Sequence, residues 1–432
     1  MTTFHVKFLG CKVSQADAMQ ARAALLAAGH REAPEAEADL HVVNTCCITR
    51  EAEAKSRQSA RRSAAGRSGR RVIVTGCAAN LNAAQFDAIA PAVTALVGTA
   101  DDVAAEVAGA AGPGCIDIEP RPPALPAGRT RGFLKVQDGC DCHCSYCIIP
   151  NVRGGARSRP AGAVLREARR RVAQGQPEMV MTGISVGDYR DPERGLELGD
   201  LMRAVASLDG VARVRLSSVE VIHVRDSLLD ALARDERICP HLHVPLQSGD
   251  DGVLASMGRS YDSAGYLAAV ARLRERVPHV NVTTDVIVGY PTEDEAAFER
   301  TLDVVREAGI TRVHVFSFSP RPGTEADRLG DPVPPAEKKR RSRELRGLSE
   351  ALSRGHRATK LQQVEEVLVD KVADTQVSGY SRDYTRYYLP ARAAVAGALV
   401  AARAAAVYSD GLSAVPLEHI RGFAPPGARL ST

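Results

Sequence analysis

Strand-type and helix-type segments alternate along the first hundred residues of the chain, and this alternation constrains the fold more than any other feature. Two amphipathic helical stretches, 16–29 and 50–66, separate short β-branched runs. The expected strands are 4–10, 39–44, 71–76 and 95–98. Segments that alternate in this way predict a doubly wound parallel sheet, the α/β class.

A cysteine follows each of the first three expected strands. These residues are Cys11, Cys46 and Cys77. Because the carboxyl ends of parallel strands share one edge of the sheet, where ligands bind, we expect the three thiols to converge. The alternative is that they are three small buried residues, since free cysteine is often found in protein cores.

The same alternation resumes from residue 131 to about 358 with six strand–helix units. The expected strands are 133–139, 179–183, 214–218, 241–247, 281–289 and 312–319. Six units are too few for a closed eight-fold barrel, so the pattern predicts a partial (βα)6 barrel with its site at the carboxyl ends of the strands. A Pro/Gly/Ala-rich stretch at 108–128, which contains Cys115, is expected to be a linker.

The last part of the chain, from about residue 360, has short β-type runs with Gly and Asp-Gly turns. This pattern predicts a small antiparallel barrel of the kind that binds nucleic acid. The Ala-rich segment 398–416 is compatible with strand or helix. We therefore expect three domains, covering residues 1–112, 126–357 and 359–426.

The segment QDGCDCHCSYCIIP, residues 137–150, places four cysteines within eight positions: Cys140, Cys142, Cys144 and Cys147. No charged and apolar leader begins the chain, and no uncharged stretch is long enough to span a bilayer. We therefore expect a cytoplasmic protein without a membrane partner, whose thiols stay reduced and serve metal or redox chemistry. Zinc sites favour two separated cysteine pairs, whereas the C-x₃-C-x₂-C spacing of Cys140, Cys144 and Cys147 suits an iron–sulfur cluster.

Three thiolates leave one iron of a four-iron cluster open. An open iron can chelate S-adenosylmethionine and pass it an electron, which breaks a carbon–sulfur bond and gives a 5′-deoxyadenosyl radical. A fourth thiolate would displace that ligand, so Cys142 is expected to point away from the cluster. The spacing, with Tyr146 between the last two cysteines, resembles the signature of the radical S-adenosylmethionine superfamily, in which the aromatic lies near the adenine.

Further segments resemble one branch of that superfamily, the methylthiotransferases. The segments are GCK at 10–12, NTCCIT at 44–49, TGCAA at 75–79, IIPNVRGGARSR at 148–159, HLHVPLQSG at 241–249, DVIVGYP at 285–291 and HVFSFSPRPGT at 314–324. The resemblance implies that Cys11, Cys46 and Cys77 hold a second [4Fe–4S] cluster and that the last domain is a TRAM-like RNA-binding barrel. The expected cofactor contacts are Tyr146, Gly183, Gln247, Gly289 and Glu293.

The chain departs from the family pattern at three positions. Thr292 stands where the family usually has glycine before the glutamate, which could alter how closely the backbone approaches the cofactor. Cys47 and Cys142 are additional thiols beside expected ligands. The motif register favours Cys46 over Cys47, although Cys47 could substitute for it.

The family attaches a methylthio group to an unactivated carbon, which requires S-adenosylmethionine, two clusters and a low-potential electron donor. Side motifs such as GCKVSQ and EAKSRQSARR most resemble the branch that modifies threonylcarbamoyladenosine 37, in the anticodon loop of tRNA. The alternatives are isopentenyladenosine 37, an aspartate of a ribosomal protein, and a non-catalytic iron–sulfur RNA-binding or redox-sensing protein. DNA is not an expected partner.

The charge pattern agrees with an RNA partner, although the formal net charge is only +4. Eight basic residues lie within 50–71 and nine within 338–360, and such runs can neutralise phosphates or form solvated helix faces. Four tyrosines of the last domain could stack on exposed bases or fill the barrel core. They are Tyr380, Tyr384, Tyr387 and Tyr388.

Overall fold

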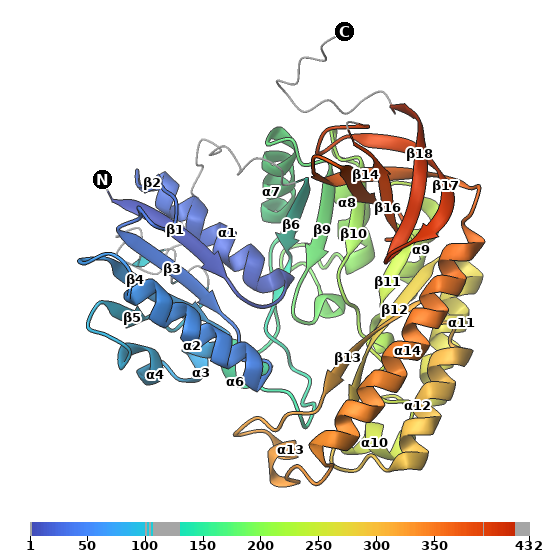
Figure 1. Cartoon of the computed structure of the whole chain (residues 1–432), viewed down its shortest axis with the longest axis horizontal. Coiled ribbons are helices and arrows are strands. Elements are labelled where there is room, and N and C mark those ends of the chain that lie inside the picture. The colour runs from blue at the N-terminus through green and yellow to red at the C-terminus, as the bar shows by residue number, and fades with distance from the viewer. Residues whose placement is uncertain (1, 100–101, 103–104, 107–129, 392, 420–432) are drawn as a thin grey trace. The chain divides into compact units, whose positions relative to one another are not determined.

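The computed structural model describes residues 2–99, 102, 105–106, 130–391 and 393–419 (Figure 1). The expected linker at 108–128 and Cys115 lie outside the described residues. The chain divides into two compact units. The first comprises residues 1–124, 138–157 and 319–328, and the second comprises 125–137, 158–318 and 329–432.

The first unit contains the predicted parallel sheet, with strand order β2-β1-β3-β4-β5. Its strands are β1 (Thr3–Phe8), β2 (Arg31–Glu32), β3 (Leu40–Thr45), β4 (Arg71–Gly76) and β5 (Val93–Ala95). Its helices are α1 (Lys12–Ala27), α2 (Arg50–Ala64), α3 (Cys77–Leu81), α4 (Ala84–Asp87), α6 (Ile149–Arg153) and α13 (Glu325–Arg328). All strand pairs are parallel, which confirms the predicted class. Every residue of β3 is buried, as expected for an inner strand covered on both faces.

The second unit contains all six predicted barrel strands. They are β6 (Arg131–Lys135), β9 (Glu178–Thr182), β10 (Arg213–Leu216), β11 (His241–His243), β12 (Asn281–Val288) and β13 (Arg312–Ser317). They form two parallel three-stranded sheets, β10-β9-β6 and β11-β12-β13, which the bridge between Ser218 and His243 joins. The result is the predicted partial (βα)6 barrel.

Helices cover one face of this half barrel. They are α7 (Ala161–Ala173), α8 (Leu198–Ala206), α9 (Asp226–Arg234), α10 (Asp251–Ser256), α11 (Ser263–Arg276), α12 (Glu295–Glu307) and α14 (Pro335–Thr359). Two 3-10 turns, η1 (Val186–Asp188) and η2 (Val221–His223), lie in the connections. The short strands β7 (Gln137–Asp138) and β8 (Arg157–Ser158) form a separate two-stranded sheet. Successive strand residues face opposite sides. Val282, Val286 and Val288 of β12 therefore join the core beneath the helices, and Thr283 and Asp285 face the inner side.

The last strands form the predicted small closed barrel, with five strands in the order β14-β15-β16-β18-β17. Its strand pairs are antiparallel as expected except β16 with β18, which is parallel. The strands are β14 (Val364–Val372), β15 (Gln376–Tyr380), β16 (Arg386–Pro390), β17 (Leu399–Tyr408) and β18 (Gly411–His419). The ambiguous Ala-rich segment is strand, with Ala402 and Ala404 fully buried in the small barrel's core. Among the described residues, no helix is both long enough and apolar enough to cross a bilayer.

A turn of the small barrel packs against the half barrel within the second unit. Arg215 donates to the carbonyls of Ser381 and Arg382 at 3.1 and 3.0 Å, and its guanidinium lies 4.6 Å from the ring centre of Tyr384. Tyr384 also stacks on Tyr380 at 4.7 Å, and Tyr387 is fully buried. Tyr388 lies edge-on to Tyr408, with ring centres 5.1 Å apart. All four tyrosines considered for base stacking therefore have packing partners inside the protein.

Candidate functional site

The three strand-end cysteines of the first unit lie at one edge of its sheet. Cys11 follows β1 and is the N-cap of α1, Cys46 follows β3, and Cys77 begins α3 directly after β4. Gly10 permits their approach, because a Cβ atom there would lie 2.9 Å from Cys46 Cβ and 3.2 Å from its Sγ. Its φ of +114° also suits only glycine.

Burial raises the pKa of Cys77 to about 11. The cation of Arg153 opposes this rise in the pKa of Cys77, and the neighbouring thiols of Cys11 and Cys46 add to it. Burial also raises the pKa of Cys46, again with a contribution from Cys11. Three thiols that influence one another in this way are a donor set suited to a cluster, which binds thiolates and displaces their protons.

Cys47 is fully buried next to the same thiols. Burial raises its pKa strongly, and Cys77 and Cys46 raise it further. The backbone N–H of Cys46, by contrast, donates to the Ser56 hydroxyl oxygen at 3.1 Å. The coupling of Cys46 to both Cys11 and Cys77 favours Cys46 as the ligand, and its assignment stays a prediction.

Sequence reasoning missed the residue that links these thiols to the next motif, Arg153 at the end of α6. Its Nε donates to Cys77 Sγ at 3.1 Å, and its two terminal nitrogens donate to Asp138 at 2.9 Å and Asp17 at 3.0 Å. The three charged side chains are at most 15% exposed. A cation placed here favours the thiolate form of Cys77.

A cavity of about 310 Å³ lies beside this arginine, within the first unit. Its lining includes Asp17, Asn44, Cys77, Asn80 and Arg153. The side-chain oxygen of Asn44 is buried and has no hydrogen-bond partner in the described part of the chain. The lining therefore presents polar atoms and a thiol to whatever occupies the cavity.

The four-cysteine loop belongs to the same unit. Gly139 shapes its start with φ of +70°, where a Cβ would come within 1.9 Å of the Gly155 carbonyl oxygen. The N–H of Cys140 donates to the Gly154 carbonyl at 3.1 Å, and that of Cys147 donates to the Cys144 carbonyl at 2.9 Å. The first bond ties the loop to the segment that follows it, and the second forms a turn within the loop.

The thiols of this loop also lie near one another. Burial raises the pKa of Cys140, the backbone N–H of Cys142 lowers it, and the thiols of Cys147 and Cys144 raise it. That N–H donates to Cys140 Sγ at 3.3 Å, so Cys142 supports the site through its backbone. Tyr146 is half-buried in the same turn. The three thiols at 140, 144 and 147 fit a cluster with one open iron.

The remaining expected cofactor contacts lie in the second unit, after strands of the half barrel. Gly183 follows β9, and a Cβ there would meet the Gln137 side-chain oxygen at 2.9 Å. Gln247 has a left-handed backbone, with φ of 67°, and exchanges hydrogen bonds with the backbone of Asp285 and Ile287 at 2.9 Å each. A non-glycine residue held in this conformation is typical of functional sites.

Gly289 and Glu293 form a buried turn after β12. The Gly289 N–H donates to Glu293 Oε1 at 2.7 Å, and Arg341 of α14 donates to the same oxygen at 2.6 Å. Burial raises the pKa of Glu293 despite both partners. The Glu293 side chain is fully buried, so the structure gives it a positioning role in this turn. Thr292 is exposed and is not among the described residues with positive φ, so this turn does not require glycine there.

Much of the basic run in α14 is internal to the fold. Lys338 pairs with Asp331, Arg341 pairs with Glu293, and Arg357 pairs with Glu350. The side chains of these three basic residues are at most 8% exposed. These three residues therefore serve the fold, and neither role considered for the run, phosphate contact or a solvated helix face, applies to them. In the first run, Arg61 and Arg62 of α2 are exposed.

Comparison with known proteins agrees with this geometry. Residues 134–305 match the radical SAM superfamily, and residues 3–98 match an uncharacterized protein family, UPF0004. The radical S-adenosylmethionine methyltransferase TsrM of Kitasatospora setae has a similar fold, with a TM-score of 0.53 and 15% identity over 73% of this chain and 75% of that chain. The half barrel and its cysteine loop thus define a radical S-adenosylmethionine protein, a class that uses this cofactor with a [4Fe–4S] cluster.

Two relatives show to which family within this superfamily the chain belongs. The threonylcarbamoyladenosine tRNA methylthiotransferase of Thermotoga maritima is 34% identical over 396 residues, covering 90% of this chain and 91% of that protein. The tRNA-2-methylthio-N(6)-dimethylallyladenosine synthase of Nocardia farcinica is 34% identical over 409 residues, covering 88% and 81%. The chain belongs to the methylthiotransferase family, whose members transfer methylthio groups.

Proposed function

We propose that the protein adds a methylthio group to C2 of N6-threonylcarbamoyladenosine at position 37 of tRNA. The observation that carries this proposal is the convergence of Cys11, Cys46 and Cys77, with Arg153 against them. A radical S-adenosylmethionine site alone requires only the loop thiols. A second set of three thiols is what sulfur insertion adds.

Cys140, Cys144 and Cys147 would hold one [4Fe–4S] cluster, and Cys11, Cys46 and Cys77 would hold a second. The first, with S-adenosylmethionine, supplies a 5′-deoxyadenosyl radical when bound, and a low-potential electron donor is required as a partner. Tyr146, Gly183, Gln247 and Gly289 are the proposed cofactor contacts, and Glu293 orders the turn that contains Gly289.

The chain's own residues prepare these sites. Arg153 holds the Cys77 sulfur through a 3.1 Å hydrogen bond and favours its deprotonated form, which is the form that binds iron. Gly139 allows the cysteine loop to turn against the Gly154–Gly155 backbone, and the N–H of Cys142 stabilises negative charge on Cys140. Three residues per site leave room for a ligand that the protein does not supply.

The threonylcarbamoyl branch is supported by the share of each relative that this chain covers. The chain covers 91% of the threonylcarbamoyl-type relative and 81% of the isopentenyl-type relative. The side motifs at 10–15 and 53–62 point the same way. The exposed Arg61 and Arg62 and the small barrel would contact the tRNA backbone near the anticodon loop, and the cytoplasm is where that substrate is found. The isopentenyl branch is the second candidate, because its relative is equally identical.

Two cysteine variants test the two-cluster proposal with one assay. Purified protein with reconstituted clusters, S-adenosylmethionine, dithionite and tRNA would be analysed for 5′-deoxyadenosine and for methylthiolated nucleoside. Cys144→Ala should form neither product, whereas Cys77→Ala should still form 5′-deoxyadenosine but no methylthiolated nucleoside. Normal methylthiolation by Cys77→Ala would refute the second cluster.

A further inference from the structure

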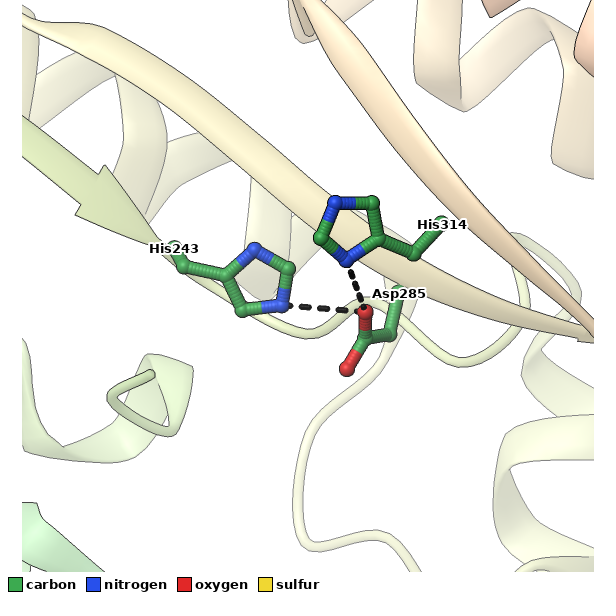
Figure 2. Close-up of side chains that lie close together, drawn as sticks. All are labelled: His243, Asp285 and His314. Carbon is green, nitrogen blue, oxygen red and sulfur yellow. Dashed lines mark ion pairs between the residues drawn. The ribbon is translucent and has the colours of Figure 1, made fainter. Parts of the chain in front are cut away.

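Three polar side chains meet on the inner face of the half barrel, within the second unit. They come from adjacent strands: His243 from β11, Asp285 from β12 and His314 from β13 (Figure 2). Both histidines direct a ring nitrogen at the same oxygen of Asp285, with His243 Nε2 at 3.0 Å and His314 Nδ1 at 3.3 Å (Figure 2). Asp285 and His314 are direct partners in the parallel register, which fixes them on one face.

We propose that His243, Asp285 and His314 form a binding site for a divalent first-row transition-metal ion. Imidazole and carboxylate ligands bind such ions at about 2.0–2.2 Å, which places neighbouring ligand atoms about 2.8–3.6 Å apart, from octahedral to tetrahedral geometry. The two nitrogen–oxygen distances fall in this range. One ligand atom from each residue lies within 4.8 Å of the others.

The surroundings hold these ligands in orientation. Thr283 Oγ1 lies 2.9 Å from His243 Nδ1, which leaves Nε2 to face the cluster. The Asp285 carbonyl accepts from the N–H groups of Gln247 at 2.9 Å and Leu246 at 3.2 Å, which restrains the backbone that carries the carboxylate. A second hydrogen bond to the distal ring nitrogen is typical of histidines that bind metals.

The ligand set also selects the class of ion. Two imidazoles and one carboxylate suit Mn²⁺, Fe²⁺ and Zn²⁺, whereas Ca²⁺ and Mg²⁺ prefer oxygen ligands alone. The side chains become progressively more exposed, at 12% for His243, 25% for Asp285 and 49% for His314. Three protein ligands on one side therefore leave coordination positions open to an oxygen donor.

This open side gives the ion a role that rests on the proposed function. A threonylcarbamoyl group carries a carboxylate and a hydroxyl, which are hard oxygen ligands for a divalent ion, and an isopentenyl group carries neither. Asp285 by itself would repel that carboxylate, whereas the bound cation would attract it. The site would therefore distinguish the two modified adenosines.

Mn²⁺ is a suitable probe, because it favours carboxylate and imidazole over the thiolates of the first unit. Full-length protein with reconstituted, oxidised clusters would be titrated with Mn²⁺, and the free ion measured from its electron paramagnetic resonance signal. We expect one saturable site that Asp285→Asn and the half-exposed His314→Gln each weaken at least tenfold. The exposed His279 offers a matched control, and His279→Gln should bind as the native chain does.

Absence of saturable binding, or equal binding by all variants, would overturn the site. Circular dichroism of His314→Gln, whose side chain is half solvent-exposed, would establish that a loss of binding is not a loss of fold. In a second arm, N6-threonylcarbamoyladenosine should tighten Mn²⁺ binding and N6-isopentenyladenosine should not. If neither nucleoside changes it, the recognition role fails while the metal site stands, and tRNA nucleoside analysis decides the proposed function separately.

Discussion

Replacement of Arg153 by methionine tests how far the first unit depends on the contact between its sheet and the cysteine-loop segment. In the native chain one guanidinium neutralises Asp17 and Asp138 and donates to Cys77. The Arg153 and Asp17 side chains are only 7% and 6% exposed. Removing one partner of a buried ion pair leaves uncompensated charge and costs about 3–5 kcal/mol.

Hydrogen exchange of the metal-free protein would measure this cost locally. Every 1.4 kcal/mol is a tenfold change in an equilibrium, so backbone amides of α1 and α6 should lose about two to three and a half orders of magnitude of protection. Peptides of the small barrel should be unchanged. Arg157→Met is the matched control, because Arg157 is exposed and donates only to the Gly155 and Arg153 carbonyls among the described residues.

The control should change protection less than about threefold, as surface substitutions usually do. A change below tenfold in α1 and α6 of Arg153→Met would refute the reasoning. It would mean that water or a rearranged side chain satisfies Asp17 and Asp138, and that the arginine is not a structural link.

Three further predictions follow from single residues. Cys142→Ala should keep 5′-deoxyadenosine formation within about threefold of native, because its backbone N–H supports the site, whereas loss as severe as in Cys144→Ala would contradict this assignment. Gly139→Ala should prevent iron loading of the loop by its clash with a carbonyl, and Gly29→Ala, with similar φ but open space, should load normally by iron analysis. Burial raises the pKa of Glu178, but the cations of Arg215, Arg213 and Arg131 outweigh burial and lower this pKa to about 2. The carboxylate therefore contributes about 3 kcal/mol of stability above the unfolded pKa of about 4.5, and this contribution is lost as pH falls toward 2. Glu178→Gln should therefore be less stable than native at pH 7 and nearly equal near pH 2 in chemical unfolding, and a constant difference would refute the pKa.

Strand positions were predictable where a local pattern decides them. Residues 71–76 form β4 as expected, because a short run rich in β-branched residues favours a buried strand over a helix. The fifth expected barrel strand, 281–289, extends only one residue beyond the end of β12. The fourth, 241–247, was expected to extend four residues further than β11, which ends at His243. Pro245 has no N–H for a ladder and Gln247 is left-handed, so the strand cannot continue.

Contacts between distant segments were not predictable from one sequence. Arg153 and Cys77 are 76 residues apart, and no spacing rule relates them. Lys338 and Arg341 resemble a solvated basic helix face in sequence, yet the structure buries them against Asp331 and Glu293. The histidine–aspartate cluster required the register of three strands, which residue types alone do not specify.

The direct test of the proposed activity is mass spectrometry of tRNA nucleosides from a strain that lacks this gene, with and without the gene restored. The proposed activity requires that 2-methylthio-N6-threonylcarbamoyladenosine is absent from the deletion strain and that its unmethylthiolated precursor accumulates. It also requires that the native gene restores the methylthiolated nucleoside while a Cys144→Ala gene does not. Unchanged levels of that nucleoside, or restoration of the isopentenyl counterpart instead, would contradict it.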